Sequence, residues 1–232
     1  MFEIRSNEPE RIDTGDYTPE EYKTFLREIR FINRYLGDGR ALKKTLFAEI
    51  EKLGLRSFSV LDVGCGSGEL LRMIGEFAAK AGRDASLIGL DLNPISTEIT
   101  KVWSKGVAPI DSIQGDAFQL PFSDNSFDYA ISSLFFHHLT DEQIIEVLNE
   151  MSRVARRGLV VIDLHRDPVA FVGYKIFCFV FRISRLVRED GSLSIRKGFR
   201  REELRELAVS AGFAVGDVVK VSPGRVVLQV NK

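Results

Sequence analysis

The stretch VLDVGCGSGEL, residues 60–70, decides the fold of this chain. Its first residues predict a short buried strand that runs into a glycine-rich turn and then into a helix beginning near Ser67. Gly64, Gly66 and Gly68 carry no Cβ atoms, so a ligand can lie against the backbone of the turn. Such a turn places free amide groups at a helix N-terminus, beside the carboxyl ends of parallel strands. We therefore expect a bound ligand at this turn.

Strands and helices alternate from residue 59 onward. Apolar runs predict strands at residues 59–63, 86–91, 110–114, 127–133 and 159–163. Apolar strands separated by helices indicate a parallel sheet covered on both faces. A helix at 201–211 precedes strands at 213–221 and 226–230, and the tight turn between these strands makes them antiparallel. The predicted fold is α/β: a doubly wound, mostly parallel sheet with a C-terminal antiparallel hairpin.

Two helices are predicted before the first strand. Residues 1–16 show no periodicity and predict an irregular arm. Thr18 begins the first helix in a capping box, and Gly37-Asp38-Gly39 ends it before a second helix at 42–53. We expect residues 1–56 to form a helical arm or lid.

The composition is that of an ordinary globular protein, with 232 residues and a formal net charge of −1. This balance gives no reason to expect nucleic acid as the main partner. Cys65 and Cys178 form no disulfide framework, and the three histidines are too scattered to predict a metal site. The polar N-terminus lacks a secretory pattern, so we expect a cytoplasmic protein, either a monomer or a homodimer.

The segment VAFVGYKIFCFVF, residues 169–181, is very apolar but is interrupted by Lys175. It is shorter than the roughly 20 apolar residues of a spanning helix. A buried helix or the wall of an apolar pocket is the favoured interpretation, and a helix lying on a membrane surface is the alternative.

Three acidic residues follow or end the first three strands. Asp62 precedes the glycine turn, where its charge would oppose a pyrophosphate and suit a cationic ammonium group. The third glycine also comes one residue too early for a dinucleotide fingerprint. Asp91 ends the second strand, where a carboxylate can accept hydrogen bonds from ribose hydroxyls. Asp116 follows the third strand and could receive the exocyclic amine of adenine.

Together with the closing hairpin, the segments VLDVGCGSGEL, LIGLDLNP and GDAFQLPFSDNSFDYAI resemble the class I S-adenosylmethionine-dependent methyltransferases. The resemblance covers residues 57–232 and implies a seven-stranded sheet, its last strand antiparallel, with S-adenosylmethionine over the glycine turn. The scattered histidines lead us to expect no metal. The wording of the third segment is most similar to the ubiquinone/menaquinone-type branch, which acts on small molecules. The segments INRYLG and DLHRDP also resemble methyltransferases encoded beside bacterial polyketide synthases, which suggests secondary metabolism.

The resemblance assigns cofactor-binding residues position by position. The glycine turn would surround the methionine end of the cofactor. Residues after strand two would bind the ribose, and residues after strand three would contact the adenine edge. The implied residues are Asp62, Gly64, Cys65, Gly66, Gly68, Asp91, Leu92, Asp116, Ala117 and Ser133.

The sequence after strand four is Ser132-Ser133-Leu134-Phe135-Phe136-His137-His138, in place of the Asn-Pro-Pro-Tyr-type motif of enzymes that methylate amino groups. This favours O- or C-methylation. His137 or His138 could serve as the general base, since a histidine titrates near neutrality. The alternative is that both only shape the turn and line the pocket.

Four residues are further candidates for contact with the substrate. Arg34 and Tyr35 end the first helix and could close over the site, although an ion pair and a core aromatic are equally ordinary roles. His165 follows strand five, and Tyr174 lies in a predicted substrate-side helical insert at 168–198. Core packing of the aromatics of this insert remains an alternative.

The sequence therefore predicts an S-adenosylmethionine-dependent methyltransferase acting on a small apolar or aromatic metabolite. One alternative is a methyltransferase of a protein or nucleic acid. The other is a non-catalytic module that binds S-adenosylmethionine, which the three acidic residues argue against.

Overall fold

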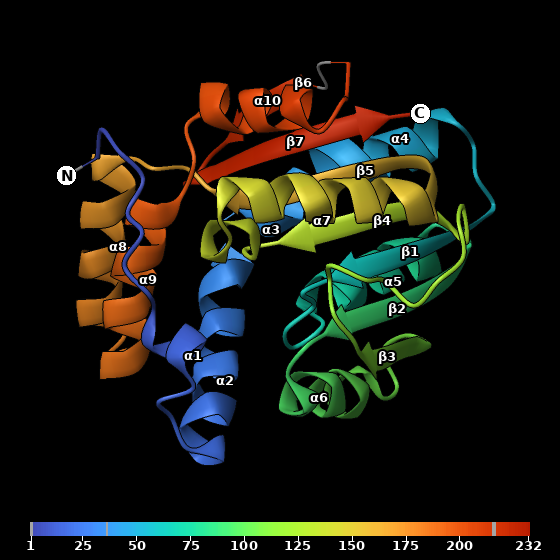
Figure 1. Ribbon diagram of the computed structural model, residues 1–232. Helices are drawn as coiled ribbons and strands as arrows, with labels where there is room; N and C mark the ends of the chain where they lie inside the picture. Colours follow the sequence, from blue (N-terminus) through green and yellow to red (C-terminus); the bar gives the residue numbers. More distant parts are fainter. Residues whose placement is uncertain (1, 36, 215–216) are drawn as a thin grey trace.

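Within the residues that the structure describes, seven strands form one sheet in the order β3-β2-β1-β4-β5-β7-β6. The computed structural model describes residues 2–35, 37–214 and 217–232, without the side chains of residues 34, 35 and 217. Figure 1 shows helices on both faces of the sheet. The strands are β1 (Ser57–Val63), β2 (Asp84–Asp91), β3 (Ile110–Gln114), β4 (Phe127–Ser133), β5 (Ala155–Leu164), β6 (Asp217–Val221) and β7 (Arg225–Asn231).

Neighbouring strands from β3 to β5 pair in parallel, whereas β7 pairs antiparallel with both β5 and β6. The predicted fold class, a doubly wound and mostly parallel sheet with a C-terminal antiparallel hairpin, is confirmed. The strand order reverses between β1 and β4. In open α/β sheets, ligands bind in the crevice beyond the carboxyl ends of the strands at such a reversal.

The helices fall into three groups. Four helices that follow β1 in the sequence cover the faces of the sheet: α5 (Glu69–Lys80), α6 (Pro94–Ser104), α7 (Asp141–Val154) and α10 (Arg201–Ser210). At one side of the sheet stand α8 (Pro168–Val180) and α9 (Arg185–Lys197), which pack against each other. The N-terminal elements are α1 (Arg11–Thr14), α2 (Pro19–Tyr35), α3 (Asp38–Leu42), the π-helical η1 (Lys43–Phe47) and α4 (Ala48–Lys52). A short 3-10 helix, η2 (Phe136–His138), follows β4.

Several boundaries differ from the sequence prediction. The helix after the glycine turn begins at Glu69 rather than near Ser67, because Gly68, with φ of +72°, still belongs to the turn. The second N-terminal helix begins at Asp38, whose carboxylate binds Arg225 of β7. The last helix is followed by β6 at Asp217 rather than by a strand from residue 213, and residues 215 and 216 lie outside the described residues.

Two apolar layers fill the space between the sheet and its helices. On one face, α7 and α10 pack their buried side chains over β4, β5 and β7. On the other face, buried residues of α3, η1, α4 and α5 cover β1 and β2. Because both layers are fully buried, the carboxyl ends of β1, β4 and β5 are held in fixed positions.

The apolar helix α8 is buried on one face only. Tyr174 and Cys178 are buried, but Val169 is 79% exposed and Phe179 is 83% exposed. The expected burial therefore holds for one face only, and the expected pocket wall also fits, because Gly173 and Phe177 line the cavity described below. The sequence shows the apolar character of the helix but not which face has a neighbour. No helix among the described residues has the length and apolar character needed to cross a membrane.

A buried ion pair attaches the N-terminal helices to the end of the sheet. The Nε of Arg225, at the start of β7, donates to Oδ1 of Asp38 at 2.5 Å, and its Nη2 donates to Oδ1 of Asn33 at 3.1 Å. Asp38 is fully buried and Arg225 is 2% exposed. Removing one partner of such a pair leaves an uncompensated buried charge.

We predict that Asp38→Asn lowers the free energy of unfolding by about 3 kcal/mol, because the Arg225 guanidinium loses its counter-charge in a buried place. Urea unfolding followed by circular dichroism measures this. The control is Asp84→Asn, at an exposed position at the start of β2. Equal stabilities of the two variants would contradict the importance of the buried pair.

Candidate functional site

A cavity of about 2240 Å³ opens beyond the carboxyl ends of β1, β4 and β5. Its walls come from the glycine turn, the segment after β4, the N-terminal arm and the helices α2, α8 and α9. Pockets for one small ligand usually measure about 300–1,000 Å³. This cavity therefore has room for two ligands side by side.

The three glycines of the turn are required for different reasons. Gly64, Gly66 and Gly68 have φ of +73°, +53° and +72°, a backbone conformation that residues with a side chain rarely adopt. A Cβ at Gly64 would lie 2.8 Å from the Phe135 ring, and one at Gly68 would lie 2.6 Å from the Thr100 side chain. A Cβ at Gly66 would meet nothing and would point into open space. Packing thus explains Gly64 and Gly68, whereas Gly66 keeps the cavity side of the turn clear.

Two carboxylates lie beside this turn, Asp62, which is buried, and Asp91, which is partly exposed. Asp91 accepts hydrogen bonds from the backbone N–H of Gly66 at 2.8 Å and from that of Asn93 at 2.9 Å. Asp62 is 2% exposed, and its Oδ1 has no hydrogen-bond partner in the described chain. Burial raises the pKa of both groups, and the charge of Asp91 adds to the rise for Asp62. An unpartnered buried carboxylate of this kind is suited to binding a cation.

The remaining predicted cofactor residues line the cavity, apart from Gly68. Leu92 is 71% exposed at its rim, and Asp116 accepts from the backbone N–H of Phe118 at 2.9 Å. Ala117 is buried, and the buried hydroxyl of Ser133 has no hydrogen-bond partner among the described residues. Cys65 is also buried and packs closely against β2, since a Cβ at Gly89 would lie 2.7 Å from its sulfur.

His137 is buried and held by a carboxylate from the neighbouring strand. Its Nδ1 lies 2.7 Å from Oδ1 of Asp163 in β5, and its backbone N–H donates to Oδ2 of the same residue at 3.2 Å. Since Asp163 accepts the proton of Nδ1, the other ring nitrogen, Nε2, is left as an acceptor. Burial would raise the pKa of Asp163, but the charge and hydrogen bond of His137 hold it below its usual range.

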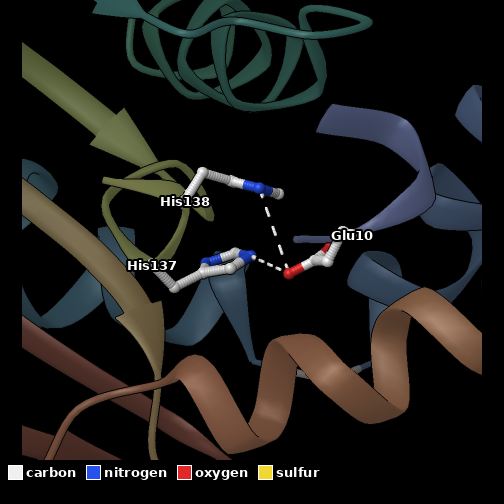
Figure 2. Close-up of side chains that lie close together, drawn as sticks. All are labelled: Glu10, His137 and His138. Carbon is white, nitrogen blue, oxygen red and sulfur yellow. Dashed lines mark ion pairs between the residues drawn. The ribbon is translucent and has the colours of Figure 1, made fainter. Parts of the chain in front are cut away.

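The N-terminal arm reaches the histidine pair from the other side. Oε1 of Glu10 lies 3.8 Å from Nε2 of His137 and 4.0 Å from Nδ1 of His138, as Figure 2 shows. Asp13 of α1 places Oδ1 2.7 Å from Nδ1 of His138. The arm, predicted as irregular, is therefore an ordered part of the site with a short helix of its own.

A buried lysine completes this cluster. The Nζ of Lys197, in α9, lies 3.3 Å from Oε1 of Glu10 and 3.1 Å from Oδ2 of Asp13. Burial raises the pKa of Glu10 against the opposing charges of His138 and Lys197. For Asp13 the balance is reversed: despite burial, hydrogen bonds and charge from His138 and Lys197 hold its pKa well below the usual range.

Sequence reasoning missed four residues of this cluster, Glu10, Asp13, Asp163 and Lys197. Asp163 gave a signal, because an acid at the carboxyl end of an apolar strand is costly to bury without a partner. Glu10 and Asp13 come from the N-terminal arm and Lys197 from α9, and no local pattern brings these two segments together.

Glu10, His137 and His138 each offer one possible metal ligand, and these atoms lie within 4.8 Å of one another. A metal ion there would have to share Glu10 with the ammonium group of Lys197, which lies 3.3 Å from Oε1. The donor set is therefore already matched to a cation of the chain itself, and the absence of a metal stays a prediction.

The structure separates the candidate substrate residues. His165 lines the cavity with Nδ1 3.6 Å from Oδ2 of Asp167, and burial together with the charge of Lys220 lowers its pKa. Tyr174 lines the wall, but its hydroxyl donates to the backbone carbonyl of Val187 at 2.6 Å, so it acts through packing. Arg34 and Tyr35 cannot be placed at the site, because their side chains lie outside the described residues.

Comparison with known proteins identifies the family. Residues 60–158 match the model of the methyltransferase domain family. The demethylmenaquinone methyltransferase of Geobacillus stearothermophilus is 30% identical over 167 residues, which cover 66% of this chain and 69% of the relative. That of Staphylococcus carnosus is 30% identical over 176 residues, with 71% of each chain covered.

Solved structures share the fold. An S-adenosylmethionine-dependent methyltransferase from Aquifex aeolicus superposes with a TM-score of 0.63 at 20% identity, covering 93% of this chain and 98% of that one. The magnesium protoporphyrin IX methyltransferase of Synechocystis PCC 6803, with bound S-adenosylhomocysteine, gives 0.57 at 16% identity, with 84% and 83% covered. The chain belongs to the class I S-adenosylmethionine-dependent methyltransferases, in the branch that includes the demethylmenaquinone methyltransferases, as the sequence motifs predict.

Proposed function

We propose that this methyltransferase acts on a small apolar hydroxyaromatic acceptor, at the hydroxyl oxygen or at a ring carbon that the deprotonated hydroxyl activates. The observation that carries the proposal is the His137 ring on the cavity wall: Asp163 holds its Nδ1, and its acceptor nitrogen, Nε2, lies 3.8 Å from Oε1 of Glu10. The names of the quinone-methylating relatives support an acceptor of this chemical class.

The residues around the glycine turn fit the cofactor. The unpartnered carboxylate oxygen of Asp62 suits an ammonium group, and the open side of Gly66 leaves room for the ligand against the backbone. Asp91 would hold the ribose, and Asp116 would meet the adenine edge beside Leu92. When bound, S-adenosylmethionine supplies a methyl group activated by its sulfonium charge.

The chain's own part in the reaction is positioning and proton removal. Nε2 of His137 would accept the hydroxyl proton of the acceptor, and buried Asp163 would stabilise the resulting imidazolium. The ammonium group of Lys197, 5% exposed, would favour the anionic form of the acceptor oxygen. Alignment of the acceptor in the cavity would contribute the rest of the rate.

The cavity wall favours an apolar acceptor of limited size. Phe25, Ile29 and Phe177 line it opposite the glycine turn. The arm covers the histidine pair so closely that Glu10 is 2% exposed. A protein or nucleic acid substrate would have to displace the arm, whereas a small molecule fits beneath it.

Replacement of Gly66 tests the cofactor assignment. We expect Gly66→Ala to weaken binding of S-adenosylmethionine in calorimetry by about tenfold or more, equivalent to about 1.4 kcal/mol, because the new methyl group enters the ligand space. Gly106→Ala is the matched control, since Gly106 also has positive φ, +76°, and open space around it but does not line the cavity. Equal affinities of the two variants would exclude Gly66 as a contact of the cofactor.

Replacement of the histidines tests the base. Product S-adenosylhomocysteine is measured with resorcinol and with 1,4-naphthohydroquinone as acceptors. We expect His137→Gln and Asp163→Asn each to lower kcat by about a hundredfold or more, because the ring loses its base or its tautomer. His138→Gln, which leaves the His137–Asp163 pair intact, should retain most of the activity.

Binding of S-adenosylmethionine to each variant, measured by calorimetry, separates a catalytic defect from a folding defect. A wild-type protein that bound the cofactor but methylated neither acceptor would contradict the proposed acceptor class. Full activity of His137→Gln would contradict the role of His137 as base.

A further inference from the structure

Helix α8 carries a stripe of large apolar side chains that face solvent. Val169, Val172, Ile176 and Phe179 are 79%, 55%, 59% and 83% exposed. Their spacing of three and four residues places them along one face of the helix. We call these four residues the α8 stripe. Val180 and Phe181 extend it, at 62% and 52% exposure.

The α8 stripe is not needed to hold the helix in place. The opposite face of α8 buries Tyr174 and Cys178 in an apolar cluster with Val187 and Ile195 of α9 and Ile32 of α2. Figure 1 shows α8 and α9 standing beside the sheet, with α8 outermost. A contiguous apolar patch that the fold itself does not require marks an interaction surface.

Exposed basic residues lie on and after α8 although the whole chain has a net charge of −1. Lys175 is exposed within the helix, Arg182 just after it and Arg188 in α9. Arg185 is also exposed and pairs with Glu189, whereas Asp167 caps the start of α8 and Asp190 is buried. An apolar face bordered by Lys and Arg matches an anionic lipid surface, where phosphate groups lie above the acyl chains.

The same helix borders the cavity of the active site. Val169, Ala170 and Gly173 of α8 line the cavity, as does Phe177 on the next turns. Val169 thus belongs both to the stripe and to the cavity wall. A surface in contact with lipid would therefore lie directly beside the entrance to the site.

We propose that the α8 stripe docks on the surface of an anionic lipid bilayer. The apolar side chains would enter the boundary between headgroups and acyl chains, and Lys175, Arg182 and Arg188 would contact lipid phosphates. The proposal rests on exposure and charge, and it does not depend on which acceptor is methylated.

Vesicle co-sedimentation tests the proposal with the full chain. The wild-type protein should sediment with vesicles of phosphatidylcholine mixed with phosphatidylglycerol, and much less with phosphatidylcholine alone. High salt should weaken the binding, because it screens the basic residues. Binding that is absent, or equal for both vesicle compositions, would overturn the proposal.

The triple variant Val172→Gln/Ile176→Gln/Phe179→Gln should lower the partition coefficient of the protein between vesicles and solution by about tenfold or more. The reason is that three apolar side chains, whose transfer from water to lipid favours binding, are replaced by polar ones. The matched control is Leu53→Gln/Val102→Gln/Val209→Gln, at positions that are 45%, 51% and 49% exposed on other helices or turns. The control variant should bind vesicles as the wild type does. Equal loss in both triple variants would overturn the assignment to α8.

A second variant tests the charges. Lys175→Gln/Arg182→Gln/Arg188→Gln should lower binding to the mixed vesicles by about fivefold for each cation removed. Binding of S-adenosylmethionine should be unchanged in both α8 variants, which shows that they are folded.

Sedimentation velocity without vesicles examines the competing occupant, a second copy of the chain. If the wild type were a dimer and the α8 triple variant a monomer, the stripe would be a dimer interface and the proposal would be wrong. A wild type that stays in the same state as the variant supports docking on lipid.

Discussion

The contact between Asp163 and His137 is the constraint on which the active site depends. A charged carboxylate buried at the end of β5 without a partner would make the free energy of folding much less favourable. His137 satisfies it twice, with the ring Nδ1 at 2.7 Å and with its backbone N–H at 3.2 Å. Because the backbone is held as well as the ring, the whole 3-10 turn after β4 is fixed relative to β5. The orientation that makes Nε2 available to an acceptor is thus a consequence of satisfying a buried charge.

The N-terminal arm is held by a second group of charged residues, which lies next to the histidine pair. Glu10 and Asp13 both lie against Lys197, and Asp190 of α9 accepts the backbone N–H groups of Arg11 and Ile12. A segment of only a few residues with little apolar surface cannot order itself by burial. Charge-assisted hydrogen bonds to α9 supply what apolar contacts do not. The arm is therefore held by polar contacts to α9 together with the apolar contacts of Phe2 and Ile12. Water can replace the polar contacts when a ligand enters.

Sequence patterns predict what is local and miss what is tertiary. The capping box of Thr18 and Glu21 is formed as the sequence predicts, because it needs only neighbouring residues. The fold class follows from the alternation of strands and helices and from the family motifs. The start of α3 at Asp38 and the ordered arm depend on Arg225 and Lys197, more than 180 residues away in each case. The glycine turn was found because its backbone geometry demands glycine, whereas Glu10 and Asp13 obey no pattern.

Helix α8 shows the same limit in a different form. Its apolar sequence favours a buried helix or a pocket wall over a lipid-facing surface, but it does not say which side of the helix faces which neighbour. The structure assigns the directions: Tyr174 and Cys178 face α9, Gly173 faces the cavity, and Val172 and Phe179 face solvent. One helix therefore joins the apolar cavity to an apolar outer surface. An acceptor that is soluble in lipid could pass along it without its apolar part being fully exposed to water, which is the physical link between the proposed acceptor and the proposed docking surface.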